Sequence, residues 1–346
     1  MSRRNAVLPS PWTDLEPGAS ADLRVRLSER YSGAPVEAPL HVSRGPEPGP
    51  TVCVTAAVHG DEINGTGAIR HLIRDRAPKL TAGTLVLVPV VNMPGFERHT
   101  RYLPDRRDLN RCFPGKADGS LAARLAWSFF ERIIRHCDWG IDLHTASVRR
   151  TNYPNVRADL NHDGLAGLAR AFGAEVVVHG AGPRGSLRRA ATRSGCPTLI
   201  LEAGEVWKVE ASVLEVAVRG VSNCLRYLGM VQGSPKPAAS PVEIRVTRWV
   251  RAEEGGFLEF HVRPGERVAA GDAIATATDL LGETRSVMTA EETGVVLGMT
   301  TMPSVFPGDP VYHLGLIEPH EAKSSGNVEP DLTGVGSDLH VVEHDG

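Results

Sequence analysis

The feature of this sequence that most constrains its fold is an alternation of short apolar runs with longer helical patterns between residues 51 and 228. The apolar runs are rich in β-branched residues and cover residues 51–58, 84–91, 139–143, 175–178 and 198–201. The helical patterns cover residues 64–76, 120–137, 164–172 and 212–228. Fully apolar strands that alternate with helices are typical of a mostly parallel sheet covered by helices on both faces. We therefore predict an α/β fold, to which the first 45 or so residues add one or two strands.

The pattern changes after the segment VQGSPKPAASP at residues 231–241, whose Pro, Ser and Gly content indicates a linker or a domain edge. Beyond it the helical period is absent, and short runs such as VRPGERV and GVVLGM are separated by Gly and Pro turns. We predict a main α/β domain over residues 1–240 and a small all-β domain over residues 242–318. Residues 321–346 are polar and are predicted to form a flexible tail.

Composition excludes several classes of protein. Hydrophobic residues make up 41% of the 346 residues, which is enough for a large core. The formal net charge of −3 argues against a general nucleic-acid-binding protein, because such proteins carry a basic excess. No apolar run approaches the roughly 18 residues that a membrane helix needs, and the start MSRRNAVLPSPW lacks the apolar core of a secretory signal. The five cysteines are far apart and odd in number, which favours free thiols in a reducing, cytoplasmic setting.

Four side chains that can bind a metal or move a proton follow three of the apolar runs. His59 and Glu62 stand in VHGDEIN after the first run, His144 ends WGIDLH, and Glu202 ends CPTLILE. Ligands of α/β sheets bind outside the carboxyl ends of the strands, so these side chains are expected at one rim. Two histidines and a carboxylate can hold a catalytic zinc ion and leave a position for water. A further carboxylate can take the proton from that water.

Each of these residues has a plainer interpretation when it is taken alone. The HxxE pair could be a chance surface pair, His144 a structural histidine, and Glu202 a cap for the next turn. Their joint position at one edge of the sheet favours the metal site. The motif LEAGE offers Glu202 or Glu205 as the proton acceptor, and Glu202 is preferred because it directly ends the strand.

A second motif, RHTRYLPDRRDLNRCFPG at residues 98–115, carries five arginines. Like charges at this density repel one another unless anions are nearby, and a planar guanidinium binds a carboxylate through two parallel hydrogen bonds. A solvated basic loop is the plainer alternative. The segment DLNR is framed by apolar residues and by Phe-Pro-Gly, which indicates a fixed turn. Asn110 and Arg111 could therefore bind a substrate carboxylate together.

The motifs HGDE, DLNR with FPG, DLH and LEAGE, in this order, resemble those of the succinylglutamate desuccinylase/aspartoacylase family, which is related in fold to the zinc carboxypeptidases. The resemblance covers roughly residues 48–318. It implies a zinc-carboxypeptidase-like mixed, mostly parallel sheet with helices on both faces and a small C-terminal β barrel-sandwich domain. It also implies a zinc-dependent amidohydrolase, with one Zn²⁺ per chain, that removes the acyl group from a small N-acylated amino acid.

The resemblance assigns a role to each matching residue of the metal site. His59, Glu62 and His144 correspond to the zinc ligands of the family. Glu202 corresponds to the general base that activates water. Asp108 corresponds to the acid that orients the first histidine, as a histidine ligand requires for its second ring nitrogen.

The remaining matches concern substrate binding. Asn110 and Arg111 correspond to the pair that binds a substrate carboxylate. Arg157 and Arg188 could contact the acyl or amino-acid part of a substrate, with surface salt bridges as the alternative.

Arg101 is the arginine expected to polarise the scissile carbonyl. Its spacing to Asn110 differs from that in aspartoacylase, so Arg106 and Arg107 stay open for this role. The implied mechanism is metal-assisted hydrolysis, in which the oxyanion is stabilised by the metal and the arginine.

Two other functions remain open from the sequence. One is a carboxypeptidase or amidase that acts on a small peptide, and the other is a non-catalytic protein that binds a carboxylated ligand. The C-terminal run resembles biotinyl and lipoyl carrier hairpins, but no lysine lies between Lys236 and Lys323, which excludes a carrier. The expected partner is a small N-acylated amino acid or amide rather than nucleic acid or a membrane, and homo-oligomer formation is left open.

Overall fold

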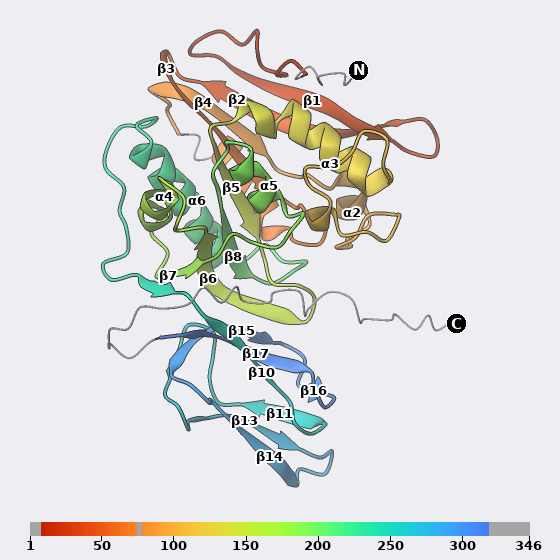
Figure 1. Cartoon of the computed structure of the whole chain (residues 1–346), viewed down its shortest axis with the longest axis vertical. Coiled ribbons are helices and arrows are strands. Elements are labelled where there is room, and N and C mark those ends of the chain that lie inside the picture. Colours follow the sequence, from red (N-terminus) through yellow and green to blue (C-terminus); the bar gives the residue numbers. More distant parts are fainter. Residues whose placement is uncertain (1–7, 75–77, 318–346) are drawn as a thin grey trace.

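A computed structural model describes residues 8–74 and 78–317 of the chain. Its centre is a set of parallel strands in the order β4-β3-β5-β8, as the alternating pattern predicts. These strands are β3 (Glu47–Ala56), β4 (Ala82–Val88), β5 (Trp139–His144) and β8 (Thr198–Gly204). The leader segment forms the antiparallel hairpin of β1 (Ser20–Glu29) and β2 (Pro35–Arg44), and β2 pairs with β4 (Figure 1).

Helices cover both faces of this sheet (Figure 1). One face packs against α1 (Asn64–Arg74), α4 (Leu165–Phe172) and α6 (Ala211–Tyr227), and the other against α3 (Leu121–Arg132) and α5 (Leu187–Arg193). Successive strand residues point to opposite faces, so Val52 and Val54 enter the first core while Cys53 enters the second. This arrangement explains why the strands are apolar without alternation and confirms the predicted fold class.

Several predicted boundaries were wrong. The helical pattern of residues 120–137 ends at Arg132, and a 3₁₀ turn, η2 (Ile134–His136), leads directly into β5. The pattern missed the short helices α2 (Met93–Glu97) and α5, as well as β6 (Arg150–Ala158). The sequence of β6, RTNYPNVRA, is polar and contains a proline, so it lacks the apolar run that marks the other strands. The strand β7 (Val176–His179) was predicted and pairs with β6.

The segment from residue 242 to residue 317, called the C-terminal unit below, contains only strands among its regular elements, as predicted. Four of these strands, in the order β14-β13-β11-β16, form a separate antiparallel sheet. The others join the large sheet, because β15 pairs with β6, and β7 pairs with β9. The bounds are β9 (Val242–Ile244), β10 (Thr247–Arg251), β11 (Gly256–Phe260), β12 (Arg267–Val268), β13 (Ala273–Thr278), β14 (Thr284–Thr289), β15 (Gly294–Thr300), β16 (Ser304–Val305) and β17 (Pro310–Leu316). The predicted tail at residues 321–346 lies outside the described residues.

The five cysteines are unpaired, as their number and spacing predicted. The thiols of Cys53, Cys137, Cys196 and Cys224 are buried and that of Cys112 is half-buried, all without a disulfide. Among the described residues, no helix has both the length and the apolar character that crossing a membrane requires.

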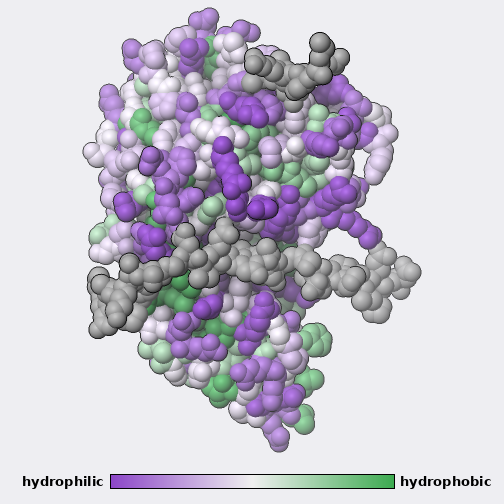
Figure 2. Space-filling view, viewed as in Figure 1, coloured by the Kyte–Doolittle hydropathy of each residue, from purple (hydrophilic) through white to green (hydrophobic). Residues whose placement is uncertain are grey.

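Large hydrophobic side chains are exposed on the C-terminal unit, where Figure 2 shows green atoms at the lower rim. They include Phe257, Leu280, Leu281, Val287 and Phe306.

A stack of side chains connects the C-terminal unit to the large domain. The rings of Trp249 on β10 and His313 on β17 lie parallel at 4.6 Å, and the guanidinium of Arg150 on β6 lies 4.7 Å from the Trp249 ring centre. His313 is buried, and its Nε2 has no hydrogen-bond partner among the described residues. Burial, assisted by Arg157 and Arg150, lowers the pKa of His313 to about 3.

This buried, neutral histidine predicts an acid-sensitive fold. Below its ordinary pKa the unfolded chain binds a proton that the folded chain does not, so stability falls as the pH drops from about 6.5 toward 3, by at most about 1.4 kcal/mol per pH unit. Replacing His313 with phenylalanine keeps a ring against Trp249 and removes the titration. We expect the urea midpoint of His313→Phe to fall less than that of the wild type between pH 6.5 and 4. Parallel decreases in the two proteins would contradict this.

Candidate metal centre

The first part of the site is the turn VHGDE after β3. The strand ends at Ala56, and His59 and Glu62 follow in a turn whose side chains are buried. Gly60 is required there because a Cβ atom would lie 2.0 Å from the carbonyl carbon of Gly95 in α2. The turn is hydrogen-bonded to the segment after β8, since the side-chain amide of Asn64 donates to Glu210 Oε2 at 2.9 Å. The local sequence therefore fixes a rigid turn at the carboxyl end of β3.

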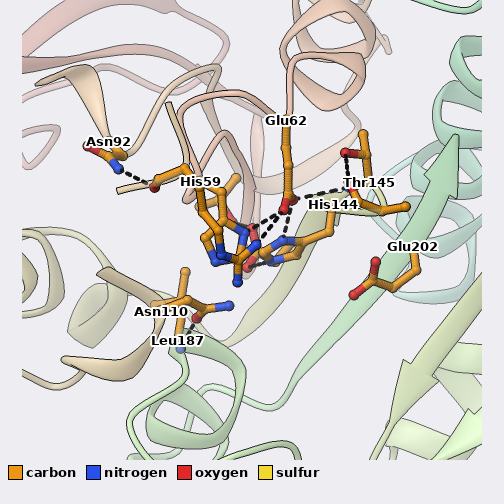
Figure 3. A network of polar contacts seen from close by, with 12 residues as sticks. His59, Glu62, Asn92, Asn110, His144, Thr145, Leu187 and Glu202 are labelled. Carbon is orange, nitrogen blue, oxygen red and sulfur yellow. Dashed lines mark hydrogen bonds and ion pairs between the residues drawn. The ribbon is translucent and has the colours of Figure 1, made fainter. Parts of the chain in front are cut away.

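His144, at the end of β5, completes the cluster (Figure 3). His59 Nδ1 lies 2.6 Å from Glu62 Oε1, and His144 Nδ1 lies 2.8 Å from Glu62 Oε2. The backbone amide of Thr145 also donates to Glu62 Oε2 at 3.1 Å. One ligand atom from each of His59, Glu62 and His144 lies within 4.8 Å of the others, so these residues could hold one metal ion. Two histidines and one carboxylate are a donor set that suits zinc.

The ring nitrogens that face away from the cluster also have carboxylate partners. His59 Nε2 lies 3.2 Å from Asp108 Oδ1, and His144 Nε2 lies 2.8 Å from Asp142 Oδ2. The hydroxyl of Thr55 donates to Asp142 Oδ1 at 2.7 Å. Such partners fix the tautomer of a histidine and direct its free Nδ1 lone pair at a metal. Each ring can therefore donate Nε2–H to its carboxylate partner and offer Nδ1 to a cation.

The electrostatics of the cluster favour a positive charge. Burial would lower the pKa of His144, but Asp142 and Glu62 outweigh burial and hold that pKa well above its ordinary value. Burial would raise the pKa of Glu62, but His59 and His144 hold it well below its usual range. Against the effect of burial, the hydrogen bond to His59 likewise lowers the pKa of Asp108. The carboxylates thus stay ionised around the two rings, where they attract either protons or a metal cation.

Arg101 lies at the edge of the cluster. Its guanidinium donates to Glu62 Oε1 at 3.2 Å and to Asp108 Oδ2 at 2.9 Å. The two alternative arginines, Arg106 and Arg107, are exposed, whereas Arg101 is only partly exposed. The structure therefore brings Arg101 to Glu62 of the cluster and leaves the other two at the surface.

Asn110 and Arg111 stand on a fixed turn, as their flanking residues predicted. The 3₁₀ turn η1 (Leu109–Arg111) is capped by Asp108, whose Oδ1 accepts from the backbone amide of Asn110 at 2.7 Å. The backbone amide of Leu187 donates to Asn110 Oδ1 at 2.8 Å, which leaves the Asn110 Nδ2 end directed into the site (Figure 3). Gly185 permits this docking because a Cβ atom there would lie 2.2 Å from the Arg111 carbonyl oxygen.

The two downstream arginines occupy different environments. Arg188 is buried near the start of α5, and among the described residues its Nη1 has no hydrogen-bond partner. Burial, together with the charge of Arg157, lowers the pKa of Arg188 to about 10. Arg157 on β6 is half-buried and donates to Asn155 Oδ1 at 3.0 Å. A buried guanidinium nitrogen without a partner is costly unless an anion meets it, so Arg188 Nη1 is available for a ligand carboxylate.

Glu202 and Glu205 differ in the partners of their carboxylates. Glu202 is paired in register with His144 on the neighbouring parallel strand, and its carboxylate points toward the cluster (Figure 3). Glu205 lies beyond the strand, and its Oε2 accepts from Lys208 Nζ at 2.7 Å. The strand register therefore brings Glu202 to the cluster of His59, Glu62 and His144, while Glu205 forms an ion pair.

Comparison with known proteins agrees with this geometry. The family described as Succinylglutamate desuccinylase/Aspartoacylase catalytic domain matches residues 48–228. The chain belongs to this family. In solved structures, the family fold extends through the C-terminal unit. A succinylglutamate desuccinylase/aspartoacylase from Rhodobacter sphaeroides matches with a TM-score of 0.74 and 28% identity, over 87% of this chain and 95% of that chain.

Two relatives and a second solved structure are also similar to this chain. The chain is 29% identical to the N-alpha-acetyl-L-2,4-diaminobutyric acid deacetylase of Halomonas elongata, over 76% of this chain and 81% of that protein. It is 32% identical to the succinylglutamate desuccinylase of Burkholderia cenocepacia, over 45% of this chain and 49% of that protein. The product-bound ectoine utilization protein EutE (DoeB) from Ruegeria pomeroyi has a TM-score of 0.76 and 26% identity, over 88% of this chain and 97% of that chain.

Non-glycine residues with positive φ occur in several turns of the protein, including those that follow β3 and β8. Among the described residues they are Ala57, His99, Arg106, Arg149 and Trp207. Ala57 precedes His59, and Trp207 follows the strand of Glu202. The Trp207 amide donates to the Asp61 carbonyl at 3.0 Å, and its indole donates to the His99 carbonyl at 2.9 Å. These contacts hold a strained loop against the metal turn, as is common at functional sites.

Asp142 is a residue of the candidate site that sequence reasoning missed. It stands two positions before His144 in DLH, and alternate residues of a strand point to the same face, so this spacing was the available signal. Replacing Asp142 with asparagine keeps the shape and removes the charge behind His144. We expect the affinity for zinc to fall about 10- to 100-fold.

The test is a zinc titration of the metal-free protein against a competing chelator. Asp138→Asn is the matched control, because Asp138 precedes the other end of β5 and accepts from the Thr51 amide at 2.7 Å. Equal zinc affinity in Asp142→Asn and Asp138→Asn would show that the Asp142 charge does not support the site.

Proposed function

We propose that this protein is a zinc-dependent hydrolase that cleaves the amide bond of a small N-acylated amino acid. The observation that carries the proposal is the buried His59, Glu62 and His144 group, with its ligand atoms within 4.8 Å and Glu202 beside His144 in the sheet. The relatives add support, since their names describe enzymes that remove an acetyl or a succinyl group from an amino acid. Binding residues lie disproportionately on loops, so we expect loops around the cluster to select the acyl group and the amino acid.

The chain's own residues would divide the chemistry as follows. His59, Glu62 and His144 would hold the zinc ion, which supplies a Lewis acid that makes water nucleophilic near neutral pH. Glu202 accepts the proton of the attacking water and returns it to the leaving amine. Arg101, already at the edge of the cluster, donates hydrogen bonds to the oxyanion that develops from the amide carbonyl.

Substrate binding in this proposal uses two sites that each contain an arginine. Asn110 and Arg111 bind one carboxylate, and their turn is fixed by the contact with Leu187. Arg188, buried with Nη1 unpaired within the described part of the chain, and Arg157 beside it contact the acyl or amino-acid part. Both sites suit a substrate that carries anionic groups next to a hydrolysable amide.

We also propose that the chain is organised as a catalytic domain over residues 1–240, a β barrel-sandwich-like domain over residues 242–318 and a tail. A separate four-stranded sheet and its own apolar core support the second domain. We infer that it narrows access to the site and favours small acylated amino acids over proteins.

The function is tested by incubating the purified full-length chain with a panel of N-acetyl and N-succinyl amino acids and measuring the free amino acid released. Release from one subset of the panel supports the deacylase and names the acyl group. Cleavage of peptides with free C-termini but of no acylated amino acid would replace it with a carboxypeptidase. Binding of these ligands without turnover would replace it with a carboxylate-binding protein.

Arg111→Ala tests the carboxylate role. Losing a charge-assisted bidentate partner should lower kcat/KM about 10- to 100-fold for a carboxylated substrate and only slightly for the matching amino-acid amide. Arg98→Ala, an exposed arginine of the same loop, is the control and should change neither value. An equal loss on both substrates would remove Arg111 from this role.

A further inference from the structure

The carboxylate of Glu202 is hydrogen-bonded by a residue of β6, a strand that contributes no residue to the His59, Glu62 and His144 cluster. The side-chain amide of Asn152 on β6 donates to Glu202 Oε2 at 3.0 Å. This hydrogen bond engages Oε2, and in the proposed function Oε1 is the oxygen that accepts the proton. The amide of Asn155 donates to the Glu202 backbone carbonyl at 3.4 Å, so β6 contacts this glutamate at both its side chain and its backbone.

The position of Asn152 depends in turn on the C-terminal unit. Strand β15 pairs with β6, with Gly298 opposite Asn152 and Thr300 opposite Arg150. Gly298 is buried, and a Cβ atom there would lie 2.4 Å from Asn152 Oδ1 and 2.7 Å from the Thr151 carbonyl oxygen. The Asn152 amide oxygen thus lies in the space left by the missing side chain of Gly298, with its nitrogen toward Glu202.

We propose that Asn152 is a positioning residue for Glu202 and that β15, through Gly298, fixes Asn152 in the conformation that reaches the carboxylate. The inference rests on the proposed function, in which Glu202 is the general base. A glutamate side chain has several rotamers, and a base acts only from within hydrogen-bond reach of its proton. A charge-assisted hydrogen bond to one oxygen selects the rotamer and leaves the other oxygen for proton transfer. The C-terminal unit would then be required for turnover itself, in addition to substrate selection.

Two substitutions of Asn152 separate positioning from packing. Asn152→Ala removes the donor and should lower kcat about 10- to 100-fold, with KM and zinc content unchanged. Asn152→Asp keeps the volume but sets a carboxylate against that of Glu202, so kcat should fall below that of Asn152→Ala. A residue that only fills space would give the opposite order, since aspartate fills the space and alanine does not.

A double-mutant cycle tests the part of β15. Gly298→Ala should lower kcat by a similar factor. Adding it to Asn152→Ala should cause little further loss in kcat, because Asn152 Oδ1 is gone and only the contact with the Thr151 carbonyl oxygen at 2.7 Å remains. Gly256→Ala is the matched control, since its Cβ atom would meet the Thr278 carbonyl at 2.6 Å in the four-stranded sheet. Losses that multiply in the double variant would overturn the coupling through Asn152.

A milder variant serves if Gly298→Ala does not fold. Thr300 Oγ1 donates to the Arg149 carbonyl at 3.1 Å, and Thr300→Val removes this anchor of β15 while keeping the shape. We expect a smaller fall in kcat that is absent in the Asn152→Ala background. Full activity in Thr300→Val, with β15 shown by hydrogen exchange to be loosened, would overturn the coupling.

Glu202→Gln distinguishes failure of the inference from failure of the proposed function. If Glu202→Gln is inactive but both Asn152 variants turn over at the wild-type rate, only the inference fails. If Glu202→Gln stays active, the base assignment fails and the inference fails with it. If the wild type hydrolyses no substrate, crystal structures of the wild type and Asn152→Ala decide, and an unmoved Glu202 carboxylate would overturn the inference.

Discussion

Replacing Glu202 with glutamine will leave zinc bound and lower kcat by about 10²- to 10⁴-fold, the usual contribution of a positioned general base. The reason is the strand register, which sets Glu202 beside His144 without making it one of the three clustered ligands. Glutamine keeps the length of the side chain and can still accept the hydrogen bond of Asn152 through its amide oxygen, but it cannot accept the proton. The measurement is zinc content together with steady-state turnover of the best substrate of the acylated amino-acid panel.

Glu205→Gln is the matched control for this prediction. Its carboxylate accepts from Lys208 at 2.7 Å, so its loss should affect only a partly exposed ion pair. Retained turnover in Glu202→Gln with loss in Glu205→Gln would show that the base is the other glutamate of LEAGE. Loss of zinc from Glu202→Gln would show instead that Glu202 is a metal ligand.

Replacing His59 with alanine will remove one of three protein ligands, and zinc content should drop to about a tenth of an equivalent or less after dialysis. The loss should exceed that of Asp142→Asn, because the ligand itself is removed and Glu62 loses a partner at 2.6 Å. Turnover should be lost along with the metal.

His41→Ala is the control for that substitution. His41 also pairs with a carboxylate, Asp22, at 2.7 Å, but on the β1–β2 hairpin away from the cluster. It should keep full zinc and full turnover. Near-stoichiometric zinc in His59→Ala, measured by elemental analysis, would remove His59 from the ligand set.

Sequence patterns predicted the centre of the fold because its cause is local. Each parallel strand is buried on both faces, so it must be an apolar run, and the polar residue that ends the run marks the sheet edge. His144 and Glu202 follow from this rule, and the pairing of β5 with β8 brings them together. The position of His59 follows from the same rule applied to β3.

The sequence could not predict the features that depend on pairing between distant segments. Strand β6 pairs with β8 on one side and with β15 of the C-terminal unit on the other, and its polar sequence contains no apolar run. Its register with β15 is set by contacts between residues that are far apart in the sequence, such as Asn152 and Gly298. No local pattern encodes such contacts. Arg101 could not be separated from Arg106 by spacing, because burial in the folded loop distinguishes them.

The proposed function depends on a zinc ion held by His59, Glu62 and His144. The most direct measurement is zinc stoichiometry by elemental analysis, with turnover of the acylated amino-acid panel followed on the same sample. We expect about one zinc per chain, turnover that a chelator abolishes, and recovery when zinc is returned. A chain that binds no metal after exposure to zinc, or that keeps full turnover with its metal removed, would contradict it.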